Sequence, residues 1–150
     1  MEETTLSSNG RGFRADGGRL GIWTPAPALL VFHVVGHGHR DFARPILEEF
    51  DRLRAAGGAI HVFGDLERLP NYDSELRIHA TEHFRAHLVS MASLHVIVKS
   101  RLVAMGVAVA NLALHGLVTV HATREPFLRA LDHQLKEQRA KGFSGSLLDT

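Results

Sequence analysis

Short apolar runs that alternate with stretches of helical spacing constrain the fold of this chain more than any other feature. Three runs share this character: residues 59–63, 94–98 and 117–121. Apolar residues at successive positions predict strands that are buried on both faces. Between the first two runs, apolar residues recur every four positions from Leu76 to Leu88, which predicts one face of a helix. Strands that alternate with helices pair in parallel through right-handed crossovers, so the sequence predicts an α/β domain.

The N-terminal half predicts a hairpin and a helix before this alternation begins. Residues 20–23 and 28–35 flank the turn sequence Thr24–Pro27, and the second run is apolar enough for a central strand. A helix is then expected from Asp41 to Gly57. Further helices are expected at residues 74–89, 100–114 and 123–138. We therefore predict a single-layer mixed sheet of about five strands flanked by about four helices.

The domain limits follow from where the apolar pattern begins and ends. Residues 1–18 are poor in apolar side chains and rich in Gly, Ser and Arg, so we expect a flexible leader there. Residues 19–138 are predicted to form the domain. Residues 139–150 contain further Gly and Ser and are predicted to be a flexible tail.

Composition restricts the partners and the compartment that we expect. Seventeen Lys and Arg residues against sixteen Asp and Glu residues give a formal net charge of +1, so no overall field attracts nucleic acid or an anionic membrane. The chain has no Cys, which removes disulfides and thiolate chemistry and fits a cytoplasmic protein. We find no signal-peptide pattern and no apolar run long enough to span a bilayer. We expect a cytoplasmic protein without a cofactor.

The loop from Asp65 to Leu76 joins the best predicted strand to the clearest predicted helix start. Pro70 and Asn71 form a turn signal in this loop. The pair Asp73 and Ser74 stands where the next helix needs an N-cap residue. The loop is the part of the sequence in which we expect function.

Both this loop and the element order resemble those of STAS domains, the family of bacterial anti-sigma-factor antagonists. The matching positions are Asp65–Leu66, Leu69 and Asp73–Ser74. The resemblance covers residues 19–138 and is closest to the SpoIIAA-like branch. In typical antagonists the serine is followed by Ser or Thr and then Gly, whereas this chain has Glu75 and Leu76 at those positions.

The resemblance implies a non-enzymatic regulatory module that binds a protein partner, an anti-sigma factor or a related kinase. It implies that Ser74 is a phosphorylatable switch residue and that Asp65, Asp73, Ser74 and Glu75 form the surface that binds the partner. The alternative from the residues themselves is that Asp73 or Ser74 is a simple helix N-cap, which contributes about 1 kcal/mol.

The eleven histidines are the unusual entry in the composition. His79, His83 and His87 lie at i, i+4 and i+8 on the helix that Ser74 opens, a spacing at which two imidazoles can chelate a transition metal. The same three positions follow the edge of the apolar stripe, where amphipathic side chains are common. We therefore predict no metal site and keep these histidines as the alternative. His61, His95 and His121 occupy strand positions and form a pH-sensitive cluster if they share a face.

On a helical wheel drawn for residues 101–115, which cover the helix predicted at residues 100–114, apolar side chains occupy more than half of the circumference. One face of a sheet cannot bury so wide an arc, so we expect a second partner for this helix. A symmetric homodimer through Val103, Val107 and Leu114 is the first hypothesis. The alternative is a bound small apolar ligand or lipid, suggested by the similarity between SpoIIAA-like domains and lipid-transfer domains of the CRAL-TRIO type.

Catalytic motifs are missing from the sequence. It contains no phosphate-binding Gly-rich loop, no nucleophile elbow and no dinucleotide fingerprint. Ser74, Asp73 and His79 lie too close together on one helical turn to form a nucleophile, an orienting group and a base in line. We therefore predict that the protein is not an enzyme.

Overall fold

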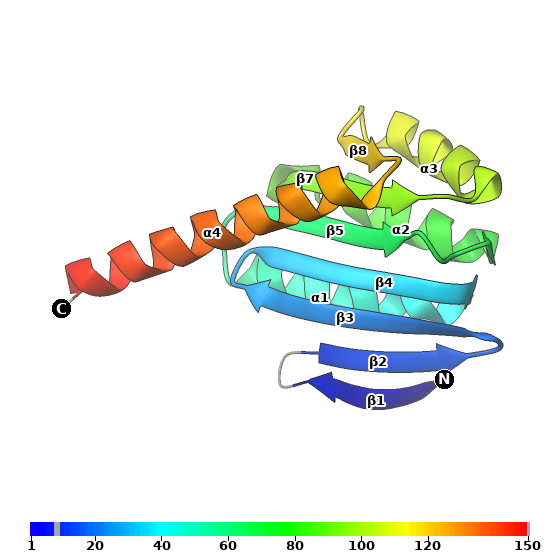
Figure 1. The fold of residues 1–150 in the computed structure, drawn as a ribbon, viewed down its shortest axis with the longest axis horizontal. Coiled ribbons are helices and arrows are strands. Elements are labelled where there is room, and N and C mark those ends of the chain that lie inside the picture. The colour runs from blue at the N-terminus through cyan, green and yellow to red at the C-terminus, as the bar shows by residue number, and fades with distance from the viewer. Residues whose placement is uncertain (8–9, 150) are drawn as a thin grey trace.

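A mixed sheet forms the centre of the molecule in this computed structural model, which describes residues 1–7 and 10–149. Its strands are β1 (Glu2–Ser7), β2 (Gly10–Ala15), β3 (Gly18–Ala26), β4 (Leu29–Gly38), β5 (Ile60–Leu66), β6 (Asn71–Tyr72), β7 (Met91–Val98) and β8 (Val118–His121). The strand order is β1-β2-β3-β4-β5-β7-β8, with β6 paired to β4 (Figure 1). Strands β1 to β4 form an antiparallel meander, and β5, β7 and β8 add to it in parallel.

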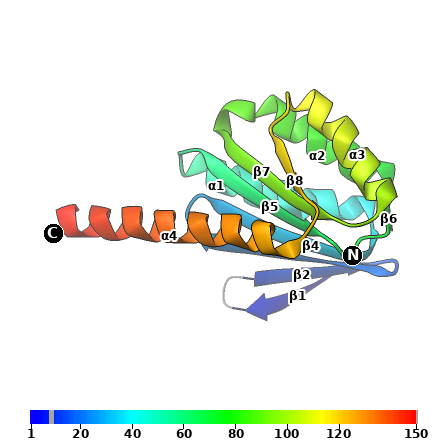
Figure 2. The ribbon, with the colours of Figure 1, turned by 45° about the horizontal axis from the view of Figure 1, so that its top comes forward.

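The helices complete the predicted alternation. They are α1 (Ala43–Ala55), α2 (Ser74–Ala86), α3 (Arg101–Ala113) and α4 (Arg124–Asp149), with short 3-10 turns at Arg40–Phe42 and Leu88–Ser90. Helices α1, α2 and α3 lie on one face of the sheet, and α4 crosses the other face (Figures 1 and 2). The α/β class and the four helices agree with the sequence. None of the helices within residues 1–7 and 10–149 combines the length and apolar character that crossing a bilayer requires.

The strand number corrects the prediction of about five strands, because the described part of the chain forms an eight-stranded sheet. Residues 1–18, predicted as a flexible leader, contain β1 and β2. Strand β2 pairs with β3 and places Phe13 in the core, whereas the described side chains of β1 are exposed on both faces. An edge strand is held by backbone hydrogen bonds and buries little apolar surface, so its composition resembles that of a disordered segment.

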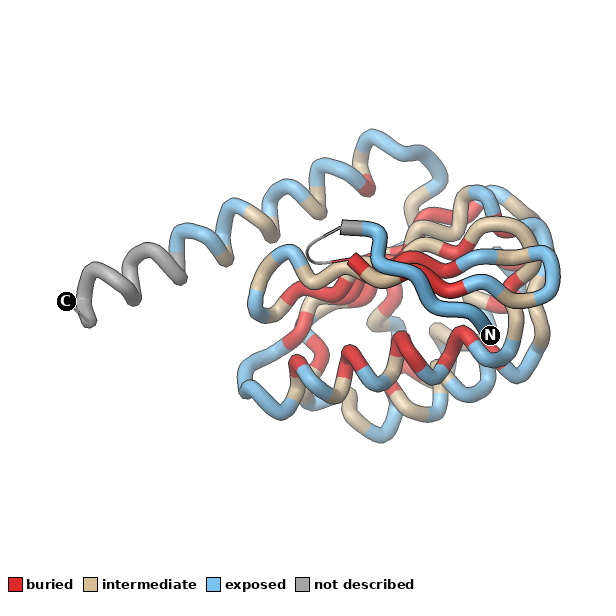
Figure 3. The backbone as a smooth tube through the Cα atoms, turned by 90° about the horizontal axis from the view of Figure 1, so that it is seen from below, coloured by how far each residue is buried: buried red, intermediate tan, exposed pale blue. Residues whose placement is uncertain are grey.

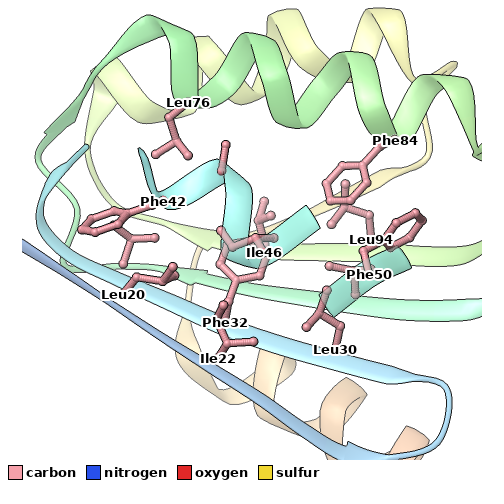
Figure 4. Close-up of a cluster of buried hydrophobic side chains, with 14 of the residues drawn as sticks. Leu20, Ile22, Leu30, Phe32, Phe42, Ile46, Phe50, Leu76, Phe84 and Leu94 are labelled. Atoms are coloured by element: carbon pink, nitrogen blue, oxygen red, sulfur yellow. The ribbon is translucent and has the colours of Figure 1, made fainter. Parts of the chain in front are cut away.

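The larger core lies between the sheet and helices α1 to α3. Phe42, Ile46 and Phe50 point at the sheet from the α1 side, and Leu76 and Phe84 point at the same space from α2 (Figure 4). The rings of Phe50 and Phe84 meet edge to face, with their centroids 5.2 Å apart. The apolar residues at every fourth position of α2 therefore form the buried face of the helix, as the sequence predicts.

Helix α4 is attached to the opposite face of the sheet by a small second core. Phe127 packs with Leu29, Phe63 and Ile97, all nearly inaccessible to solvent. Farther along the helix, the side-chain amide of Gln138 both accepts from the N–H and donates to the carbonyl of Ala28. The helix continues to Asp149, past the predicted end at residue 138, and its C-terminal part extends beyond the sheet (Figures 2 and 3).

Candidate functional site

The loop between β5 and α2 is held in place by contacts at several points along its length. The carboxylate of Asp65 accepts a hydrogen bond from the N–H of Glu67 at 3.2 Å, which turns the chain at the end of β5. Leu69 is buried, and the hydroxyl of Ser100, at the start of α3, donates to the carbonyl of Pro70. The loop is therefore a structured surface between the sheet and α3.

Asp73 fastens the end of this loop to the end of β4. Its backbone occupies the N-cap position of α2, as predicted, but its side chain makes no capping hydrogen bond to that helix. One carboxylate oxygen instead lies 2.9 Å from Nε2 of His37, and the other accepts from the N–H of Arg40 at 2.9 Å. Nδ1 of His37 lies 2.5 Å from the side-chain oxygen of Asn71. We call these contacts of His37, Asn71, Asp73 and the Arg40 N–H the His37–Asp73 clamp.

The clamp favours charged forms of both titrating groups. Both ring nitrogens of His37 face oxygen acceptors, so the imidazolium donates two hydrogen bonds, and the bonds to Asn71 and Asp73 raise the pKa of His37 above its ordinary value of 6.5. The hydrogen bond from the Arg40 N–H and then that from His37 lower the pKa of Asp73 below 3.8. The clamp is therefore strongest between these two pKa values.

A pH-dependent stability difference should separate the wild type from a His37→Gln variant. A raised pKa in the folded state means that the His37 contribution is fully present below pH 6.5 and is lost as the pH rises through the folded-state pKa. We expect His37→Gln to destabilise the protein more at pH 6 than at pH 9 in urea unfolding. His79→Gln, an exposed change on α2, is the control. An equal loss for His37→Gln at both pH values would contradict the clamp.

Ser74 and Glu75 are exposed on the first turn of α2. The α2 N-terminus carries partial positive charge, which favours a negative group there, while the carboxylates of Asp73 and Glu75 flank the Ser74 position. The hydroxyl of Ser74 is thus reachable by a partner, next to a backbone that the clamp keeps in place.

Asp65 belongs to a separate set of contacts. Its second carboxylate oxygen accepts a hydrogen bond at 2.7 Å from the guanidinium of Arg124, the first residue of α4. The same guanidinium lies 3.6 Å from Glu67. The structure therefore brings Asp73, Ser74 and Glu75 together at the start of α2, while Asp65 ties the end of β5 to α4.

An apolar cavity lies between α2, α3 and the sheet. Its volume is about 130 Å³, and its lining includes Val103, Val107 and Leu114 of the α3 region, Phe84 of α2 and Val96 of β7. The hypothesis of a dimer interface through these α3 residues is corrected for two of them. Val103 and Leu114 are each 2% exposed and pack in the chain's own core, so they are not available to a second subunit. They remain compatible with a ligand.

The solvent side of α3 carries a different set of apolar residues. Leu102, Met105, Val109 and Leu112 are exposed, Leu112 to 82%. Gly106 faces the other way, where an added Cβ would lie 1.9 Å from the hydroxyl oxygen of Tyr72. The small residue thus permits the close approach of α3 to β6 within one chain. Helix α3 therefore does carry the excess apolar surface that the sequence predicts, but on its solvent side and not at Val103 and Leu114.

Comparison with known proteins identifies the architecture. No protein-family model and no curated protein matches the sequence. The structure is similar to that of an uncharacterized protein of the DUF3478 family from Shewanella loihica PV-4, described as having a SpoIIAA-like fold, with a TM-score of 0.53. This chain therefore has a SpoIIAA-like fold. The match covers 79% of this chain and 98% of the other at 19% identity, so it establishes the fold alone.

Several strand histidines meet on the α4 face of the SpoIIAA-like sheet. Nδ1 of His95 lies 3.0 Å from Nε2 of His121, and the His95 ring stacks on Phe63 with centroids 4.6 Å apart. Nδ1 of His61 lies 2.7 Å from the hydroxyl of Ser93. The sequence alone could not show that these histidines share a face, because the register between β5, β7 and β8 determines which residues lie side by side.

Burial gives His95 the opposite pH behaviour to His37. Desolvation, followed by the charges of His121 and His61, lowers the pKa of His95 below 6.5. A lowered pKa in the folded state means that folding favours the neutral ring. The His95 contribution is therefore present above pH 6.5 and is lost as the pH falls through the folded-state pKa.

His79, His83 and His87 do not share one environment, and His87 is the C-cap residue that follows α2. His79 is exposed, whereas His83 and His87 lie partly buried and close to Asp51 of α1. Among the described residues, this is the group of three side chains that could hold a metal ion. Asp51 could not be found from the sequence because it lies 32 residues before His83 on a separate helix.

Proposed function

We propose that this chain is a non-enzymatic regulatory module that binds a protein partner through the start of α2, with Ser74 as its phosphorylatable switch. The observation that carries the proposal is the exposed Ser74 hydroxyl at the N-terminus of α2 on a SpoIIAA-like fold. The partner proposed from the resemblance is an anti-sigma factor or a related kinase.

Local geometry and electrostatics support a switch at this position. The clamp fixes the residue before Ser74, so a partner meets a preformed surface rather than a loop that must be ordered on binding. A phosphate on Ser74 adds close to two negative charges beside Asp73 and Glu75. The helix N-terminus favours that charge, while the carboxylates repel it. Phosphorylation would therefore change the charge of this surface strongly.

Paired substitutions test the switch. We expect Ser74→Glu to reduce capture of the partner from a lysate of the producing cells by roughly tenfold relative to Ser74→Ala, which corresponds to about 1.4 kcal/mol. Quantitative mass spectrometry measures the captured protein and, in the wild type, also detects phosphate on Ser74. The control is Thr123→Glu, an exposed change just before α4. Equal capture by the two Ser74 variants would exclude the switch.

The apolar cavity favours a second candidate function, a sensor or carrier of a small apolar ligand. A cavity of about 150 Å³ lined by apolar side chains can hold benzene, and the cavity of this chain, about 130 Å³, is close to that size. Pockets for drug-sized ligands measure about 300–1,000 Å³, so we propose a small ring compound rather than a lipid. Nε of Arg77, which lines the cavity, is buried without a hydrogen-bond partner among the described residues and could donate to a ligand oxygen.

Phenol is a suitable probe because it combines a small ring with an oxygen. At a concentration of 100 times its Kd, a ligand raises the free energy of unfolding by about 2.7 kcal/mol. We expect phenol to raise the melting temperature of the wild type and of Val109→Phe, a change at a position that is 55% exposed. Val107→Phe should fill the cavity and abolish the rise. An unchanged rise in Val107→Phe would place phenol elsewhere.

The homodimer stays a prediction, and we now propose the exposed side of α3 as its interface in place of Val103 and Leu114. Leu102 to Ala113 contains no charged residue, so two copies of this helix can approach without charge repulsion. We propose that Leu102, Met105, Val109 and Leu112 pack against the same residues of a second chain. A monomeric mass in light scattering would contradict this.

A further inference from the structure

Three metal-ligating side chains of α1 and α2 meet outside the surface around Ser74. Asp51 projects from α1, His83 lies in the last turn of α2, and His87 is the C-cap residue just after that helix. One ligand atom from each residue lies within 4.8 Å of the other two. Nε2 of His83 is 2.7 Å from a carboxylate oxygen of Asp51, and the centroids of the two imidazole rings are 4.8 Å apart.

The surroundings fix the orientation of both imidazoles. Phe50, fully buried between α1 and α2, meets the His83 ring edge to face at 5.9 Å and the tilted His87 ring at 6.5 Å. His83 and His87 are partly buried, which limits the rotamers that they can adopt. Because the rings are held beside each other before any ligand binds, little side-chain entropy remains to be lost on binding.

We propose that Asp51, His83 and His87 bind one divalent transition-metal ion, with Zn²⁺ as the preferred ion. The imidazole of His83 on α2, that of His87 at the C-cap of this helix and a carboxylate from α1 supply the nitrogen and oxygen ligands that Zn²⁺ takes in sites with three protein ligands. Water completes the tetrahedron. Imidazole ligands disfavour Mg²⁺ and Ca²⁺, which prefer oxygen.

Entry of the ion requires the three ligand atoms, which lie within 4.8 Å of one another, to adjust to tetrahedral spacing. Bonds of about 2.0–2.1 Å in a tetrahedron place two ligand atoms about 3.3 Å apart. The contact between His83 and Asp51 therefore has to open by roughly 0.6 Å, and Nε2 of His83 has to be without a proton: a neutral ring carries its proton on Nδ1 instead, and an imidazolium releases one proton to water. The guanidinium of Arg54 lies 3.3 Å from the same carboxylate oxygen of Asp51 and shares this carboxylate with the ion. Its positive charge weakens the binding of a cation, so the site is weaker than one with an unshared carboxylate.

The bound ion would link α1 to α2 directly. In its absence the two helices are joined here by one hydrogen bond and by the packing of Phe50, whereas the ion joins ligands from both helices at one centre. Metal binding would therefore stabilise the folded chain, because the ligands do not meet in the unfolded state. This site is independent of the switch proposed at Ser74.

Calorimetric titration of the untagged, chelator-treated full chain with ZnCl₂ tests the site. We expect one ion per chain. We also expect at least tenfold weaker binding in His83→Ala, His87→Ala and Asp51→Asn, since even changes beyond the direct ligands cost about 10–100-fold. Asp51→Asn keeps the size of the side chain, so it remains informative if a histidine variant fails to fold. His79→Ala, one turn earlier on α2, should bind as the wild type does.

Thermal unfolding gives an independent readout. Zn²⁺ should raise the melting temperature of the wild type and of His79→Ala, and should raise that of Asp51→Asn less at the same ZnCl₂ concentration. Absence of stoichiometric binding to the wild type would overturn the proposal and leave Asp51 and His83 as an ordinary hydrogen-bonded pair. Equal loss of binding in His79→Ala and His83→Ala would overturn it as well, because it would indicate diffuse binding along α2.

Discussion

Replacing Phe127 with Ala is expected to give the largest loss of stability, because this side chain attaches α4 to the sheet. Phe127 is 2% exposed and meets the ring of Phe63 edge to face, with centroids 5.7 Å apart. Truncation of a buried Phe to Ala costs about 3–5 kcal/mol. We expect a decrease of that size in the free energy of unfolding measured in urea.

Leu128→Ala provides the matched control for Phe127→Ala. Leu128 is the next residue of α4 and is 45% exposed, so its truncation should change the free energy of unfolding by no more than about 0.5 kcal/mol. Hydrogen exchange gives the location of the effect. The amides of α4 should exchange faster in Phe127→Ala, since only partly buried side chains such as Leu131 and Leu135 and the hydrogen bonds of Arg124 and Gln138 would then hold the helix. Similar losses for both variants would show that Phe127 does not anchor α4.

The sequence predicts those helices and strands whose own side-chain pattern is enough to determine the secondary structure. The α2 stripe at Leu76 and Phe84 and the helix start predicted at residue 100 are local patterns, and the structure confirms both, with Ser100 as the N-cap of α3. Strand β1 could not be predicted because an edge strand needs no apolar face. Strand β6 could not be predicted because two residues are too few to show an alternation of apolar and polar side chains. These two strands depend on the backbone of β2 and β4 and not on their own composition.

The candidate site shows the same division between local and long-range information. The exposed Ser74 at the start of α2 could be predicted from the loop and the cap signal. The partner of Asp73 could not, because His37 is 36 residues away and is brought near by the pairing of β6 with the end of β4. Asp51 beside His83 is a second example. The spacing of His83 and His87 in the sequence could indicate two ligands of the proposed metal site, whereas the third, Asp51, is brought to them only by the packing of α1 against α2.

The placement of His37 depends on Gly18, so Gly18→Ala is expected to disturb both stability and the clamp. A Cβ added at Gly18 would lie 1.8 Å from the carbonyl oxygen of His37 and 2.8 Å from its carbonyl carbon. Gly18 begins β3 and pairs in register with Gly36 of β4, so the clash falls on backbone that cannot rotate away. Steric overpacking of this kind costs about 1–3 kcal/mol. Urea unfolding should show a decrease in that range.

A second readout separates displacement of His37 from a general loss of stability. If the end of β4 moves away, His37 loses its bonds to Asn71 and Asp73, and its raised pKa should fall toward 6.5 in an NMR titration of the folded protein. Gly17→Ala is the control: its backbone has a φ of +81°, so alanine is strained there, but an added Cβ meets no atom of the described residues within 4 Å. That variant should lose stability while the pKa of His37 stays raised. A pKa of His37 that falls equally in both variants would mean that the clamp responds to any strain in the β2–β3 turn and not to the Gly18 contact.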